Sequence, residues 1–272
     1  MSPLAHRRWI YRFPMVVRVS HWANAACLGI LVMSGLQIFN AHPALYWGDD
    51  SDFDRPILSI GAVRNDDGRP IGVTRIFGWT FDTTGVLGWS RISGRPVPRA
   101  FPGWLTIPSV QDLATGRVWH FFFAWLFVAN GLVYIGYSSL SRHFSRTLVP
   151  RRSEWHTIWR TVREHVRLRP HHGVDESSYN ILQKLAYLGV TLVVGPLIVL
   201  TGLAMSPAVD AAVGWLPDVF GGRQSARTIH FVATGLFILF VVAHVAMVLV
   251  TGVWNNLRSM VTGWYGVSRG TV

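Results

Sequence analysis

The sequence predicts an all-α integral membrane protein, a four-transmembrane-helix bundle with a long periplasmic loop between the first and second helices. Of its 272 residues, 50% are hydrophobic and only 14% are charged, whereas soluble domains carry about 25% charged residues. Four uncharged runs each approach or exceed the roughly 20 residues that cross a membrane as a helix. Thirteen Trp suit a protein with two membrane–water interfaces. The composition therefore argues against a soluble protein and excludes a disordered one.

The four runs give the predicted helices their approximate bounds, which are 19–39, 117–138, 181–204 and 227–254. One membrane domain, 1–272, is expected to contain all of them. Basic residues before the first run are typical of a signal peptide, but the early His21 and the lack of a small-residue cleavage site favour a retained helix. The single cysteine, Cys27, excludes an internal disulfide and a thiolate-bound iron–sulfur cluster.

The distribution of charge predicts the orientation of the chain. The formal net charge is +11, and all of it lies on the N-terminal segment, the 138–184 connection and the C-terminal tail. The loops at 40–117 and 205–227 each carry as many Arg as Asp. Because basic loops stay on the cytoplasmic side, both termini are predicted to be cytoplasmic, in a bacterial inner membrane. The arginines follow the ends of the helices, which argues against nucleic-acid binding.

The two long connections differ in character. Segment 40–116 is predicted to form an ordered periplasmic cap, because Asp67-Gly68 between two short apolar runs indicates a hairpin. This cap either shields the helix ends or docks a soluble partner. In segment 153–169, apolar residues recur at helical spacing with arginines at the other positions. That pattern predicts an amphipathic helix lying on anionic membrane lipid.

Apart from basic residues at the helix ends, the ionisable residues inside the predicted helices are all histidines, namely His21, His120, His230 and His244. Ionisable groups within a membrane are rare and indicate function by default, and histidine is the usual axial ligand of b-type haem. The four runs contain no Asp or Glu, which disfavours a proton-driven transporter. For any single one of these histidines, a hydrogen-bonded role in helix packing is the alternative.

The spacing of the histidines indicates two metal centres. His230 and His244 are 14 residues apart on one helix, so they share a face and lie roughly 21 Å apart along its axis. One therefore lies near each surface of a hydrocarbon core about 30 Å thick. By depth, His120 is level with His230, and His21 with His244, which predicts two bis-histidine sites that each hold one haem b. His42, just past the first helix, is an alternative to His120.

An arginine precedes three of these histidines by three residues, and these arginines are Arg18, Arg117 and Arg227. Residues at this spacing share a helix face. Haem propionates lie at the headgroup level and bind cations, so the three arginines are candidate propionate partners. The alternative is that they only extend to the membrane surface.

The sequence resembles the membrane-bound, di-haem cytochrome b subunits of bacterial nickel–iron hydrogenases and formate dehydrogenases, and the related anchors of thiosulfate reductases. The resemblance rests on the four histidines and on Tyr179-Asn180-Ile181-Leu182-Gln183-Lys184, which matches the YN-x-x-QK signature of that family. It implies the same ligand pairing and a quinone pocket beside the cytoplasmic haem, with Asn180 as a hydrogen-bond partner. From the residues alone, Asn180 is equally suited to cap the third helix.

These patterns predict an electron-transfer subunit of an oxidoreductase complex, in which two haem b groups connect the quinone pool with a periplasmic redox enzyme. Loop 40–117 is longer than expected for a hydrogenase or formate dehydrogenase anchor, which favours a molybdenum enzyme as the partner. Two other functions stay open. One is a self-sufficient, superoxide-oxidising cytochrome that reduces quinone, and the other is a haem-free transporter or assembly protein.

Overall fold

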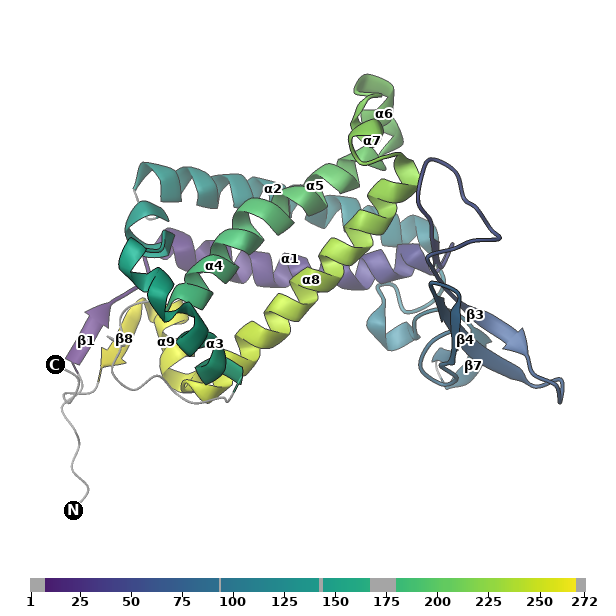
Figure 1. Ribbon diagram of the computed structural model, residues 1–272, viewed down its shortest axis with the longest axis horizontal. Coiled ribbons are helices and arrows are strands. Elements are labelled where there is room, and N and C mark those ends of the chain that lie inside the picture. Colours follow the sequence, from purple (N-terminus) through teal and green to yellow (C-terminus); the bar gives the residue numbers. More distant parts are fainter. Residues whose placement is uncertain (1–7, 93, 142–143, 167–179, 268–272) are drawn as a thin grey trace, which may run out of the picture. The chain divides into compact units, whose positions relative to one another are not determined.

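The computed structural model describes residues 8–92, 94–141, 144–166 and 180–267 (Figure 1). Within these residues, four helical spans are long and apolar enough to cross a membrane. They are α1 (Met15–Phe39), α2 (Leu113–Leu140), the run of α4 (Ile181–Gly189), η4 (Val190–Val194) and α5 (Gly195–Ala204), and α8 (Arg223–Val250). Large apolar side chains such as Phe122, Leu132 and Leu239 are exposed on them, as expected where lipid is the solvent. The mostly helical fold with four candidate spans is thus as predicted.

The helix bounds differ from the predicted ones at several ends. The spans α1, α2 and α8 begin at residues 15, 113 and 223, ahead of the predicted 19, 117 and 227, because the residues before each uncharged run also take helical backbone. The last span ends at Val250 rather than 254. Gly252, with φ of 105°, breaks it there, and the chain resumes as α9 (Val253–Thr262).

The chain divides into two compact units, which we describe separately. The terminal unit comprises residues 1–24, 130–196 and 235–272, and the loop unit comprises residues 25–129 and 197–234. Segments of α1, α2 and α8 belong to each unit.

In the terminal unit, segments from opposite ends of the sequence pair with each other. Strand β1 (Arg8–Tyr11) lies antiparallel to β8 (Trp264–Val267), as Figure 1 shows. The guanidinium of Arg12 lies 4.8 Å from the ring centre of Tyr265, which adds a cation–π contact beside the pair. The short π-helix η2 (Phe144–Leu148) and the 3₁₀ helix η3 (Arg152–Thr157) precede the short α-helix α3 (Ile158–Val166).

The predicted amphipathic segment 153–169 corresponds to η3 and α3, and its residues 167–169 lie outside the described residues. Trp155 and Trp159 are 50% and 79% exposed, which fits a face that lies on lipid. Glu154 accepts hydrogen bonds from Lys184 Nζ at 2.7 and 2.9 Å and thereby ties η3 to α4. Burial raises the pKa of Glu154, but the bonds from Lys184 and from the Arg151 backbone outweigh it, so the net pKa is below its usual range.

The loop unit carries the strands of segment 40–116. Its main sheet is antiparallel, in the order β2 (Ala44–Leu45), β3 (Leu58–Arg64), β4 (Pro70–Ile76) and β5 (Trp79–Asp82). The predicted hairpin is confirmed, since β3 pairs with β4 from Leu58–Ile76 to Arg64–Pro70. Gly68 takes φ of 75° in its turn, a conformation that favours glycine. The other elements are β6 (Trp89–Ile92), β7 (Arg95–Pro98), η1 (Gly103–Leu105), α6 (Pro207–Ala212) and α7 (Leu216–Val219).

A buried arginine fastens this segment to α1. Arg99 is 3% exposed and donates hydrogen bonds to the carbonyl of Ser109 at 2.6 Å, to Thr106 Oγ1 at 2.8 Å and to the side chain of Gln37. Burial lowers the pKa of Arg99, although a guanidinium stays protonated at any physiological pH. The network holds the 99–109 backbone against the C-terminal end of α1.

Candidate functional site

The loop unit brings together the predicted pair His120 and His230. His120 lies on α2 and His230 on α8, and their ring centres are 6.4 Å apart with an interplanar angle of 64°. Both side chains are largely enclosed by neighbouring helices. The structure thus brings these two imidazoles together with their ring planes steeply inclined, at the same level as their predicted depths in the membrane require.

Hydrogen bonds at the Nδ1 atoms leave the Nε2 atom of each ring available. His230 Nδ1 lies 3.0 Å from the carbonyl of Ile198 and 3.1 Å from Thr201 Oγ1. Because a carbonyl only accepts, Nδ1 of His230 carries the proton and Nε2 carries the lone pair. His120 Nδ1 lies 3.1 Å from Ser34 Oγ. A haem-ligating histidine needs this tautomer, because the ligating nitrogen must be deprotonated while the other nitrogen donates.

Two glycines lie against these rings. A Cβ atom built at Gly35 would be 3.3 Å from His120 Cε1, and one built at Gly202 would be 3.4 Å from His230 Cε1. A Cβ atom 3.3 Å from the His120 ring would already require that ring to shift by a few tenths of an ångström. The glycines therefore allow the helix backbones to approach the imidazole rings closely.

The terminal unit brings together the second predicted pair. His21 on α1 and His244 on α8 have ring centres 6.2 Å apart, with an interplanar angle of 57°. Their surroundings are aromatic: Trp22 lies 5.2 Å from His21, and Phe240 and Tyr187 lie 5.9 and 6.3 Å from His244. His21 Nδ1 is buried and has no hydrogen-bond partner among the described residues.

Both ring separations suit one metal ion between two imidazoles. With metal–nitrogen bonds of about 2.0–2.1 Å, as at zinc, opposed rings have centres roughly 6 Å apart. Over the described ranges, no cluster of three or more His, Cys, Asp or Glu could hold a metal ion. A haem iron needs fewer protein ligands, because the porphyrin fills four positions and the protein supplies the axial ones. The residues present therefore fit haem.

Two of the candidate propionate arginines lie in the loop unit and have contacts within the protein. Arg227 donates a hydrogen bond to the carbonyl of His42, and its guanidinium lies 5.5 Å from the ring centre of Phe39. Arg117 is exposed and lies 5.6 Å from the ring centre of Phe121. Arg227 thus anchors the chain that follows α1, a role that its sequence position did not indicate.

The third candidate, Arg18, lies in the terminal unit beside an apolar groove of about 530 Å³. Its Nη1 donates to the carbonyl of Val261, and Trp22 Nε1 donates to the carbonyl of Met260 at 3.1 Å. Its Nε is buried and has no partner within the described part of the chain. Arg18 therefore keeps one unused hydrogen-bond donor, and its contact with a propionate stays a prediction.

Asn180 is the N-cap of α4. Its Oδ1 accepts a hydrogen bond from the backbone N–H of Gln183 at 2.9 Å, and the Gln183 side chain accepts one from the Asn180 backbone at 3.2 Å. This reciprocal pair is a capping box. The cap uses the side-chain oxygen and leaves the amide NH₂, so a hydrogen bond from Asn180 to quinone stays a prediction. Tyr179 of the signature lies outside the described residues.

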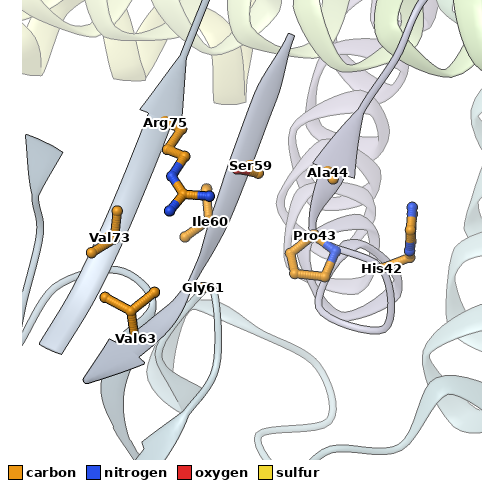
Figure 2. A pocket seen from close by; sticks show the side chains of 9 residues that line it. All are labelled: His42, Pro43, Ala44, Ser59, Ile60, Gly61, Val63, Val73 and Arg75. Carbon is orange, nitrogen blue, oxygen red and sulfur yellow. The ribbon is translucent and has the colours of Figure 1, made fainter. Parts of the chain in front are cut away.

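His42 faces a different environment from the paired histidines. Its ring contacts Tyr46 and Phe53, with ring centres 5.6 and 5.8 Å away. Burial and the charge of Arg227 lower the pKa of His42, so the ring is neutral at pH 7. His42 lines a pocket of about 210 Å³ together with residues of β3 and β4. Figure 2 shows His42 next to Pro43 among these lining residues. The ring that faces His230 is that of His120, so the alternative ligand His42 is not supported.

Sequence reasoning did not single out Ser34, Thr201 or Gly202. A hydroxyl followed directly by glycine inside an apolar span was the available signal, as in Ser34-Gly35 and Thr201-Gly202. Such pairs also occur at sites of simple helix packing. Only the positions of the imidazole rings in the structure distinguish a pair that contacts a histidine from one that serves helix packing alone.

Four apolar spans with two facing histidine pairs define a membrane protein of the b-type cytochrome class. The family model described as prokaryotic cytochrome b561 matches residues 12–263, and the chain belongs to this family. It is therefore a membrane protein that binds haem b and transfers electrons. The resemblance to membrane cytochrome b subunits is confirmed at the level of this family.

A curated relative from Azospira oryzae is named "Putative protein-methionine-sulfoxide reductase subunit YedZ1". It is 26% identical to this chain over 251 residues, which are 92% of this chain and 95% of the relative. The similarity thus extends over nearly the whole length of both proteins.

Proposed function

We propose that the chain is a di-haem cytochrome b that transfers electrons between membrane quinone and a soluble oxidoreductase. The observation that carries the proposal is that each unit contains one facing histidine pair, with ring centres 6.4 and 6.2 Å apart. Bound haem supplies one-electron transfer at its iron, while the protein supplies binding, orientation and electrostatics. His120 with His230 would hold one haem, and His21 with His244 the other.

The charge distribution supports an orientation with both termini in the cytoplasm and segment 40–116 in the periplasm. That segment exposes large aromatic side chains, which supports partner docking over simple shielding of helix ends. They include Trp47, Phe77, Trp79 and Trp104, at 63%, 76%, 75% and 75% exposure. The soluble oxidoreductase would dock on this surface.

The name of the Azospira relative supports a sulfoxide reductase that acts on protein methionine as the partner. It specifies no metal, so a molybdenum enzyme stays a prediction. Because the family binds haem b, the haem-free transporter loses its support. The self-sufficient cytochrome differs from the proposal in one measurable respect, because it would need no soluble partner for turnover with quinone.

The proposed quinone site can be tested at Asn180 with quinol-driven haem reduction in liposomes. Replacing Asn180 by Ala or by Asp is expected to slow reduction about fivefold with both haems bound, because one hydrogen bond of about 1 kcal/mol is lost. Asp keeps the acceptor that caps α4 and removes only the amide donor. A wild-type rate in Asn180→Asp beside a slow Asn180→Ala would assign the residue to capping alone.

A further inference from the structure

A six-residue pattern occurs twice in the loop unit. Residues 31–36 of α1 read Leu-Val-Met-Ser-Gly-Leu, and residues 198–203 of α5 read Ile-Val-Leu-Thr-Gly-Leu. Each position holds the same kind of side chain in both copies. The hydroxyl of the first copy contacts His120 and that of the second contacts His230, both at 3.1 Å from Nδ1.

The two copies also use their hydroxyl groups in the same way. Ser34 Oγ lies 2.7 Å from the carbonyl four residues earlier, that of Ile30, and Thr201 Oγ1 lies 2.6 Å from that of Leu197. Each hydroxyl proton is therefore donated to its own helix, and the oxygen accepts the Nδ1–H of the histidine. The adjacent glycine then faces Cε1 of the same ring.

The histidines of the terminal unit have no such support. Within the described residues, Nδ1 of His21 is buried and has no hydrogen-bond partner. Their neighbours are the aromatic rings of Trp22, Phe240 and Tyr187. The two histidine pairs thus have similar ring separations, 6.4 and 6.2 Å, but differ in the hydrogen bonding at Nδ1.

We propose that this repeat, residues 31–36 and 198–203, is a histidine-positioning element. It lowers the reduction potential of the haem bound by His120 and His230 and leaves that of the other haem unchanged. The inference rests on the proposed function, since it presumes a haem at each pair. A hydrogen bond from Nδ1–H makes the imidazole a more basic ligand. A more basic axial ligand stabilises ferric over ferrous iron, and second-shell hydrogen bonding is one of the factors that set haem potentials. Ser34 and Thr201 are accordingly positioning residues.

The test is a redox titration of purified protein that carries His21→Ala, so that the remaining haem is the one on His120 and His230. Adding Ser34→Ala and Thr201→Val is expected to shift the ferric–ferrous equilibrium about threefold toward ferrous iron, an increase of about 28 mV for one electron. The shift is partial, because the carbonyl of Ile198 still accepts from His230 and that of Leu31 from His120. Thr201→Val alone should shift it less, because Ser34 still accepts from His120. Thr201→Ser should restore the wild-type value.

Thr234→Val is the matched control. Its hydroxyl bonds the carbonyl of His230 at 2.8 Å, within its own helix, and does not contact an imidazole nitrogen, so the potential should stay unchanged. The same Ser34 and Thr201 substitutions in a His120→Ala background should leave the other haem unaffected. An unshifted potential in the first background, or an equal shift in both, would overturn the inference.

Two further outcomes are informative. Loss of this haem from the Ser34→Ala, Thr201→Val protein, with retention in Thr201→Ser, would support the positioning role, because outer partners typically contribute 10–100-fold to metal affinity. A wild-type protein with fewer than two haems would instead refute the proposed function itself. The wild-type haem content is therefore measured first, which keeps the two failures distinct.

Discussion

The variants His120→Ala and His230→Ala are each expected to lose the same haem, the one in the loop unit, and to retain the other. Both substitutions remove a ligand from the loop unit, where the two rings lie 6.4 Å apart. His21→Ala and His244→Ala are expected to lose the other haem, because those rings form the pair in the terminal unit. The measurement is haem content with a reduced-minus-oxidised spectrum, compared among the four variants.

His42→Ala is the control for this series, since its ring contacts Tyr46 and Phe53 rather than His230. It should retain both haems with unchanged spectra. If His120→Ala and His21→Ala lost the same haem, the pairing would be wrong. Loss of a haem from His42→Ala would restore that residue as a ligand.

Gly35→Val is expected to lose the haem of His120 and His230 while keeping the other. A Cβ atom at residue 35 would lie 3.3 Å from His120 Cε1, and the two methyl groups of valine would extend into the space of the ring. Displacing an axial imidazole by even a fraction of an ångström weakens or breaks its bond to the iron. Haem content per protein again gives the result.

Gly29→Val is a matched control for this substitution, because residue 29 lies on the same helix and a Cβ atom there has no neighbour within 4 Å. The two variants carry the same change in helix propensity. Retention of both haems in Gly35→Val would show that the close contact is not needed. Loss of a haem from both variants would attribute the effect to the helix rather than to the ring.

The pairing of the histidines was predictable because it depends on helix length and depth alone. An α-helix rises 1.5 Å per residue, so the 14 residues between His230 and His244 separate two levels, and each level has one partner on a neighbouring helix. The structure brings together His120 with His230 and His21 with His244. Their role as haem ligands stays a prediction.

The hydrogen bonds around the site were not predictable in the same way. The spans are apolar on most faces, so hydrophobic periodicity does not say which face of α1 or α5 meets a histidine. Ser34 and Thr201 therefore resembled ordinary helix residues until the facing rings were known. Asn180 suited both a cap and a ligand contact by residue type, and the backbone geometry shows the cap. Arg227 binds the carbonyl of His42, a contact that depends on the path of the chain after α1.

The haem-to-protein ratio of purified wild-type protein, with its reduced-minus-oxidised spectrum, tests the central claim most directly. Two non-covalent haem b groups per chain are expected, because the two facing histidine pairs each fit one iron. A C-x-x-C-H haem attachment is excluded by the sequence, since Cys27 is its one cysteine. A ratio of one haem per chain would make one histidine pair structural and would contradict the di-haem account.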